Sequence, residues 1–180
     1  MAAEKLRPAY LQRLRGVRTR SEAPYPEWRE SVICGLGGAL AIAILYALAV
    51  DLKLVACFLV PFGATCALVF GLPTAPVCQP RNILGGHVLS ALVGVTVVVL
   101  FRQATWWTLA LAIGLAMGLM TATRTYHPPA AVTVLLPILQ KITAVTWVLA
   151  PVGLGAMILI VIALLYNNLF AERHYPTFWW

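Results

Sequence analysis

Two short polar segments carry the residue types that could do chemistry in this chain. Each combines an arginine, a histidine and proline within a few positions, between two apolar stretches. An arginine guanidinium stays charged and offers five N–H donors, so this combination is typical of a site for a small anion. The first segment contains Gln79, Pro80, Arg81, Asn82 and His87, and the second contains Arg124, His127, Pro128 and Pro129.

The prolines of both segments predict the first turns of two helices, starting at Pro80 and at Pro128 or Pro129. Proline suits the first turn, where its missing N–H would have no intrahelical partner. The free N–H groups and the dipole at a helix start attract negative charge. We therefore expect the two arginines to supply positive charge to a bound anion. The side chains expected to replace its water are Gln79, Asn82, His87 and His127.

Each of these residues also has a structural interpretation. The arginines could be anchors whose charged ends reach the lipid headgroups. His87 could bond to a backbone carbonyl, and His127 could cap a neighbouring helix. Gln79 and Asn82 could be ordinary turn residues. Their joint occurrence favours the anion site, because residues 52–171 contain no aspartate or glutamate to pair with the arginines.

The composition places both segments in a membrane protein. The chain has 180 residues, of which 61% are hydrophobic and 11% charged, whereas soluble domains carry about 25% charged residues. This hydrophobicity also excludes a disordered chain. A net charge of +7 can indicate a nucleic-acid partner, but most of this chain is uncharged, and such a partner needs clustered basic residues. We predict an all-α, polytopic helical bundle in the lipid bilayer.

Five uncharged stretches are long enough to cross a bilayer, which takes roughly 17–25 residues. They are residues 32–50, 54–72, 84–101, 106–122 and 142–166. A sixth stretch, residues 128–139, is short and is either a re-entrant helix or a short tilted span. We therefore predict five to six segments in a membrane domain of residues 32–166, flanked by a basic N-terminal segment (1–31) and an aromatic tail (167–180).

The distribution of lysine and arginine predicts the orientation. With a cytoplasmic N-terminus, ten basic residues lie inside and three outside, as the positive-inside rule expects. We predict a multi-pass protein of the inner (plasma) membrane in this orientation. The spacing of Leu6, Tyr10 and Leu14 fits either an amphipathic helix on the membrane surface or a disordered basic tail.

Small residues recur at every fourth position in three of the apolar stretches. Such stripes allow helices to approach closely in lipid, either within the bundle or between copies in a homo-oligomer. The stripes are Ala39/Ala43/Ala47, Gly86/Ser90/Gly94 and Ala110/Gly114/Gly118.

The sequence shows no motif for catalysis, metal binding or a cofactor. Metalloprotease, nucleophile-elbow and P-loop patterns are absent. The cysteines form no C-x-x-C pair, whereas zinc sites need closely spaced ligands. We interpret Cys34, Cys57, Cys66 and Cys78 as small apolar side chains, and we expect no enzymatic activity.

The two polar segments resemble the signatures of the HPP family of integral membrane proteins. The second contains the namesake His-Pro-Pro-Ala at residues 127–130, preceded by Arg124 and Thr125. The first resembles the family's other signature, which here runs from Phe70-Gly71-Leu72-Pro73 through Gln79-Pro80-Arg81-Asn82 to Gly85-Gly86-His87. The resemblance covers roughly residues 31–166. The family is usually described with four spans, and relatives linked to nitrite transport imply a small-anion substrate.

We therefore expect a transporter or channel for a small inorganic anion. Nitrite is the first candidate, because its two oxygens fit the fork of a guanidinium. The histidines would make its binding depend on pH. The alternative is a membrane scaffold or assembly protein without transport, in which the arginines are anchors and the stripes make helix contacts. A membrane enzyme acting on a lipid or phosphate is a third interpretation.

Overall fold

The computed structural model describes residues 27–51 and 59–180, and all regular secondary structure in these residues is helical. Within them, three helical segments are long and apolar enough to cross a membrane. They are α2 (Trp28–Asp51), α4 (Pro80–Phe101) and the pair η3 (Val148–Gly153) and α8 (Leu154–Asn167), which has a kink at Ala150 (φ −137°, ψ 121°). Three shorter apolar segments are α3 (Leu59–Gly71), α5 (Trp106–Ala122) and the pair α6 (Ala130–Thr133) and α7 (Leu135–Gln140). The predicted all-α bundle is confirmed.

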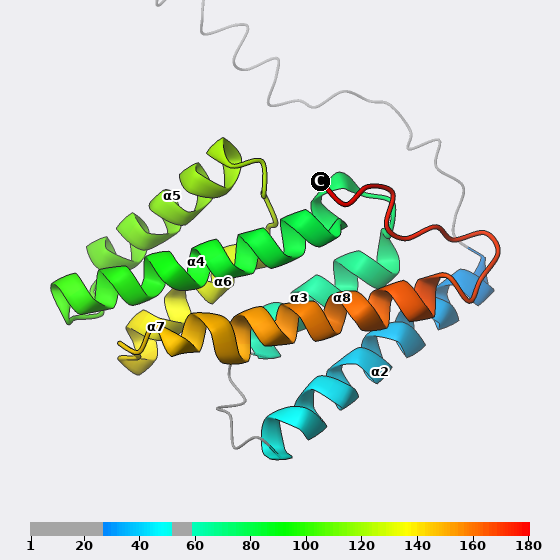
Figure 1. The fold of residues 1–180 in the computed structure, drawn as a ribbon, viewed down its shortest axis with the longest axis horizontal. Coiled ribbons are helices and arrows are strands. Elements are labelled where there is room, and N and C mark those ends of the chain that lie inside the picture. The colour runs from blue at the N-terminus through cyan, green and yellow to red at the C-terminus, as the bar shows by residue number, and fades with distance from the viewer. Residues whose placement is uncertain (1–26, 52–58) are drawn as a thin grey trace, which may run out of the picture.

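The helices run back and forth between two ends of the bundle (Figure 1). We call one the tail end; it holds the start of α2, the start of α4 and residues 168–180. The other, the far end, holds the end of α4 and the end of α7, where Arg102 and Lys141 line one groove. The segment α6–α7 starts beside the first turns of α4 and finishes at the far end (Figure 1).

Several predicted boundaries agree with the structure. Helix α5 occupies the predicted residues, and Thr105 and Thr108 form a capping box at its start. Helix α4 begins at Pro80, in the first turn as the proline predicts. Helix α2 begins at Trp28, four residues before the predicted apolar stretch, because backbone hydrogen bonds already form at the charged residue Glu30 and at Ser31. The structure does not describe residues 1–26 and 52–58. The amphipathic helix predicted around Leu6, Tyr10 and Leu14 lies in the first of these ranges.

The last predicted stretch begins later in the structure than at residue 142. Lys141 ends α7 with a left-handed backbone (φ 56°), and the chain needs the next residues to reverse direction. Its helical part therefore starts close to Val148. The segment from Val148 to Asn167 still has 20 residues, which is long enough to cross a membrane.

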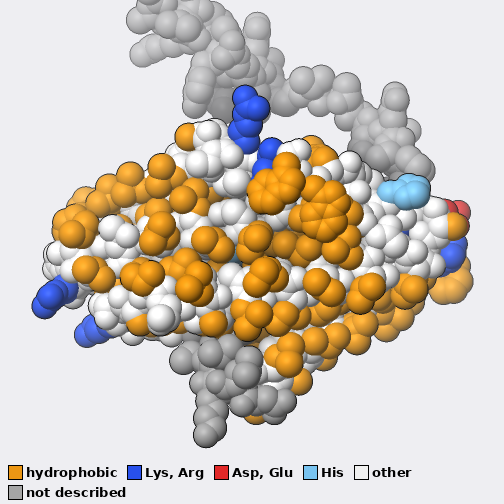
Figure 2. All heavy atoms as spheres, viewed as in Figure 1, with side chains coloured by type: hydrophobic (Ala, Val, Ile, Leu, Met, Phe, Trp, Pro, Cys, Tyr) orange, Lys and Arg blue, Asp and Glu red, His pale blue; other side chains and the backbone are white. Residues whose placement is uncertain are grey.

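Helix α4 lies at the centre of the bundle and packs against α5, α6, α7, η3 and α8. Its stripe Gly86/Ser90/Gly94 is buried, with the glycines against the α6–α7 segment and Ser90 against Met120 of α5, so it serves internal packing. The stripes Ala39/Ala43/Ala47 and Ala110/Gly114/Gly118 lie on the outer surface. Hydrophobic side chains cover the middle of the visible face, with Lys and Arg toward its edges (Figure 2), as a bilayer partner requires. Association of copies through the outer stripes stays a prediction.

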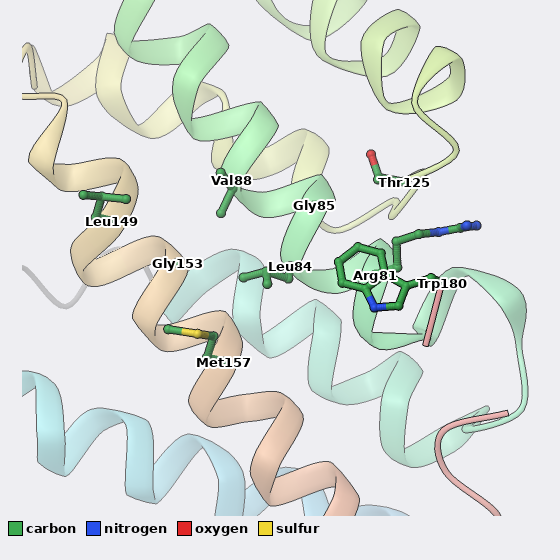
Figure 3. Close-up of a pocket in the computed structure, with 9 residues that line it drawn as sticks. All are labelled: Arg81, Leu84, Gly85, Val88, Thr125, Leu149, Gly153, Met157 and Trp180. Carbon is green, nitrogen blue, oxygen red and sulfur yellow. The ribbon is translucent and has the colours of Figure 1, made fainter. Parts of the chain in front are cut away.

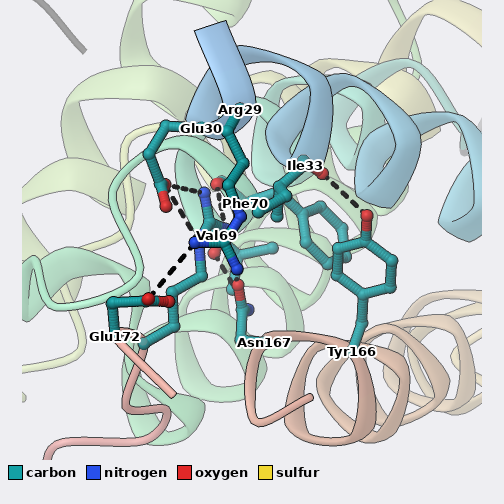
Figure 4. Close-up of polar contacts among 9 residues, drawn as sticks. Arg29, Glu30, Ile33, Val69, Phe70, Tyr166, Asn167 and Glu172 are labelled. Carbon is teal, nitrogen blue, oxygen red and sulfur yellow. Dashed lines mark hydrogen bonds and ion pairs between the residues drawn. The ribbon is translucent and has the colours of Figure 1, made fainter. Parts of the chain in front are cut away.

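A buried arginine bonds to groups on three helices at the tail end (Figure 4). Arg173 is 7% exposed, and its guanidinium pairs with Glu30 of α2 at 2.6 Å. It also donates to the carbonyl of Phe70 at 2.9 Å and to the side chain of Asn167 at 3.0 Å. By sequence, Arg173 is one of the ten basic residues expected on the cytoplasmic side; in the structure it joins α2, α3 and α8.

Replacing Arg173 by glutamine is expected to lower the free energy of unfolding by roughly 2–3 kcal/mol, because it leaves buried acceptors without donors. Glu30 is partly exposed, so solvent reduces the share of the ion pair itself. The measurement is thermal unfolding in detergent. The matched control is Arg29→Gln, whose pair with Glu172 is exposed and whose loss should change little; equal losses in both variants would contradict the buried role.

Candidate functional site

The structure brings the two histidines of the predicted site together inside the bundle. His87 on α4 and His127 just before α6 are fully buried, with ring centroids 5.1 Å apart. Between them lies the hydroxyl of Thr65, on α3. Its oxygen is 2.9 Å from Nε2 of His87 and 3.0 Å from Nε2 of His127. Thr65 was not among the predicted residues.

The remaining ring nitrogens also have close partners. Nδ1 of His87 lies 2.8 Å from the hydroxyl of Thr133 on α6. Nδ1 of His127 lies 2.7 Å from the carbonyl oxygen of Val77 in the turn η2 (Pro76–Cys78). We call Thr133, His87, Thr65 and His127, in this order, the histidine–threonine chain. It ties α3, α4, α6 and η2 together.

The carbonyl at one end fixes the direction of these hydrogen bonds when both rings are neutral. A carbonyl only accepts, so Nδ1 of His127 carries the hydrogen and Nε2 accepts from the Thr65 hydroxyl. The Thr65 oxygen then accepts from Nε2–H of His87, and Nδ1 of His87 accepts from the Thr133 hydroxyl. Each donor has one acceptor, so the chain is satisfied without any charge, as buried polar groups require.

Close packing at Gly86 positions His127. A Cβ added at Gly86 would lie 2.8 Å from Cβ of His127 and 3.0 Å from the carbonyl oxygen of Thr125. Only glycine lets the segment before α6 approach α4 this closely. The His-Pro-Pro segment therefore meets α4 one residue before His87, which is what allows the two rings to share Thr65.

The two arginines lie away from the histidine–threonine chain. Arg124 is exposed and has a left-handed backbone (φ 58°). Arg81 is half-buried, with its guanidinium 5.6 Å from the ring centroid of Phe178. It borders an apolar groove of about 400 Å³ together with Trp180, and its guanidinium points away from Leu84 (Figure 3). In the described part of the chain, no hydrogen bond joins either arginine to a histidine.

Gln79 and Asn82 hold the backbone around the site. The Gln79 amide donates to the carbonyls of Pro73 and Ala75 at 3.0 and 2.9 Å, and its oxygen accepts from the backbone N–H of Thr177 at 2.8 Å. These contacts fix η2 and the tail.

Asn82 links the two polar segments of the sequence. Its amide donates to the carbonyl of Tyr126 at 2.9 Å, while its own carbonyl oxygen is buried without a partner among the described residues. The second segment continues into α6, which starts at Ala130 directly after Pro128 and Pro129.

The described cysteines have no partner that would make a metal site. No group of three His, Cys, Asp or Glu side chains in residues 27–51 and 59–180 is arranged to hold a metal ion. Cys66 and Cys78 are buried and Cys34 is partly buried, whereas Cys57 lies outside the described residues. Burial raises the pKa of the Cys78 thiol to about 11, so it stays protonated.

Comparison with known proteins assigns the family. The model of the HPP transmembrane region matches residues 23–176. Two proteins of Dictyostelium discoideum, both named only as transmembrane proteins, are similar. One is 31% identical over 95% of this chain and 63% of its own length, and the other is 35% identical over 85% of this chain and 50% of its own. The chain thus spans less than two thirds of these relatives, and no solved structure matches it. The chain belongs to the HPP transmembrane-region family and is a multi-pass membrane protein.

Proposed function

We propose that this chain transports a small inorganic anion across the membrane, with nitrite as the first substrate to test. The observation that carries the proposal is the buried histidine pair, bridged by one hydroxyl within a bundle of membrane-crossing helices. Ionisable side chains are costly at membrane depth and commonly mark an ion or proton pathway. A transport role, rather than catalysis, also suits a sequence without a catalytic motif.

The side chains of the histidine–threonine chain would act as donors to the anion. Hydroxyls can turn, and imidazole nitrogens can donate or accept, so the same groups that satisfy one another at rest can replace water around an ion. Arg81 and Arg124 would act at the tail end by attracting anions from solution. This division of roles follows from their positions, since the arginines are near the surface and the histidines are buried.

The positions of the basic residues at the two ends of the bundle also suit the predicted orientation. We propose that the tail end faces the cytoplasm of a bacterial inner membrane. This orientation places Arg81 and Arg124 inside and leaves Arg102 and Lys141, which share the groove at the far end, outside, as the positive-inside rule favours.

Nitrite uptake into proteoliposomes tests the function. Wild-type protein is expected to exceed empty liposomes clearly, and His127→Gln is expected to lose at least about tenfold in rate, which corresponds to about 1.4 kcal/mol. Arg124→Gln is expected to lose rate mainly at low nitrite and low salt, because its charge acts by attraction. The matched control is His174→Gln, which alters an exposed histidine of the tail and should transport normally. Equal uptake by wild type and empty liposomes would overturn the proposal.

A further inference from the structure

We propose that a proton is the co-substrate of this site: one proton binds at Nε2 of His127, with Thr65 as the group that reorients to receive it, and crosses together with the anion. The inference rests on the proposed transport function for the identity of the anion. The proton site itself rests on the contacts of Thr65.

The Thr65 hydroxyl has one hydrogen and two acceptors within reach. Nε2 of His127 lies 3.0 Å away and the carbonyl oxygen of Pro61, one helical turn earlier, lies 3.1 Å away. When both rings are neutral, the direction of the hydrogen bonds in the histidine–threonine chain assigns this hydrogen to Nε2 of His127. The carbonyl of Pro61 is then the second position to which the hydroxyl can turn.

Proton binding at His127 uses that second position. The added proton forms an N–H at Nε2, which donates to the Thr65 oxygen, while the Thr65 hydrogen turns to the carbonyl of Pro61. The Thr65 oxygen continues to accept from Nε2–H of His87, so its two lone pairs are both used. One proton has entered, one hydroxyl has turned, and every donor still has an acceptor.

His87 is less suited to receive the proton. Its unprotonated nitrogen, Nδ1, accepts from the Thr133 hydroxyl. Among the described residues, this hydroxyl has no second acceptor to which it could turn. A second proton on the pair is also disfavoured, because two cations with ring centroids 5.1 Å apart would repel. The geometry therefore points to one proton for the pair.

The proton needs an anion beside it. The titratable groups on the elements packed around the pair are Cys66 on α3, Cys78 on η2, Tyr126 directly before His127, and Tyr175 of the tail, whose hydroxyl donates to the carbonyl of Cys78. The charged groups there are two cations, Arg81 on α4 and Arg124 on the segment before α6. The thiols and phenols are neutral when protonated, and burial raises the pKa of the Cys78 and Tyr175 groups; the arginines are cations and cannot balance a proton. No acidic residue occurs in residues 52–171, and a buried unpaired cation is costly.

A bound anion supplies the missing negative charge. Proton and anion then strengthen each other's binding by the same factor, as thermodynamic linkage requires. The two leave the site as a neutral pair, which avoids moving net charge through the bilayer. We expect the apparent affinity for the anion to rise as pH falls, by up to about tenfold per pH unit where the site is mostly unprotonated.

The test measures proton and nitrite movement together in proteoliposomes loaded with a pH-sensitive dye. An inward nitrite gradient is applied near neutral pH, and the signal of empty liposomes, which reports diffusion of nitrous acid, is subtracted. Wild type is expected to acidify the interior with about one proton per nitrite. Nitrite entry without acidification would overturn this inference and leave the proposed function; no protein-dependent nitrite entry would overturn the proposed function.

Variants of Thr65 test the reorienting hydroxyl. Thr65→Ser retains the hydroxyl and is expected to keep coupled movement, whereas Thr65→Val retains the shape and should lose at least tenfold in coupled rate. Thermal unfolding of both variants is measured alongside. If a folded Thr65→Val protein moves protons and nitrite as wild type does, Thr65 is not the reorienting group.

Discussion

Replacing Gly86 by alanine is expected to stop nitrite uptake while leaving a folded protein. The new Cβ would lie 2.8 Å from Cβ of His127 and 3.0 Å from the carbonyl of Thr125. Since α4 is held by helices on several sides, the segment before α6 must move. A displacement of about 1 Å lengthens the contact between His127 and Thr65 beyond hydrogen-bond range. We expect at least a tenfold loss of uptake and roughly 1–3 kcal/mol lower stability from overpacking.

The control for this variant is Gly114→Ala on α5. A Cβ at Gly114 meets nothing within 4 Å, and alanine is a better helix former than glycine. This variant should transport normally and be at least as stable as wild type. Uptake and thermal unfolding in detergent are the measurements. If Gly86→Ala transports normally, His127 does not act through its position against α4.

Replacing Gly94 by alanine is expected to give the largest loss of stability of any substitution considered. The added Cβ would collide with the backbone carbonyl oxygen of Val134, at the junction of α6 and α7, and would lie 3.1 Å from the Pro137 ring. Neither a backbone carbonyl nor a proline ring can rotate away as a flexible side chain would. The two segments must therefore separate, which we expect to cost more than about 3 kcal/mol.

Thermal unfolding in detergent measures this loss, with Gly118→Ala on α5 as the control. A Cβ at Gly118 meets nothing within 4 Å, so only the favourable change in helix propensity remains. Equal unfolding temperatures for the two variants would show that α6–α7 does not pack against α4 through Gly94.

The two glycines together explain how a short segment packs closely along α4 toward the far end. Residues 128–139 form a short helical segment, and Val134 between α6 and α7 keeps a right-handed helical backbone (φ −61°, ψ −29°). Packing against α4 at Gly86 and Gly94 surrounds this segment with protein.

The sequence alone determined the all-α membrane bundle, most of its segments and its two histidines. Hydrophobicity acts locally, so a run of apolar residues such as 106–122 identifies its helix wherever that helix packs. The position of Pro80 in the first turn of α4 is equally local. His87 and His127 were recognisable because ionisable side chains beside apolar stretches are rare and costly.

Only the tertiary structure identified Thr65 and Thr133, the threonines of the histidine–threonine chain. The Thr65 hydroxyl lies within hydrogen-bond distance of the carbonyl four residues earlier, as those of Thr96 and Thr121 on other helices do. These threonines are therefore equivalent from local sequence. Packing of α3 against α4 and α6 places Thr65 between rings that are 22 and 62 residues away along the chain, and no short-range pattern encodes such a contact.

The tertiary structure also decided which basic residues are buried. From sequence, Arg81, Arg124 and Arg173 are similar charges at the ends of apolar stretches. In the structure Arg173 is buried with Glu30, whereas Arg124 is exposed and Arg81 lies beside Phe178. The difference arises because partners for a buried charge come from helices far apart in sequence, while attraction to the membrane surface requires only the charge itself.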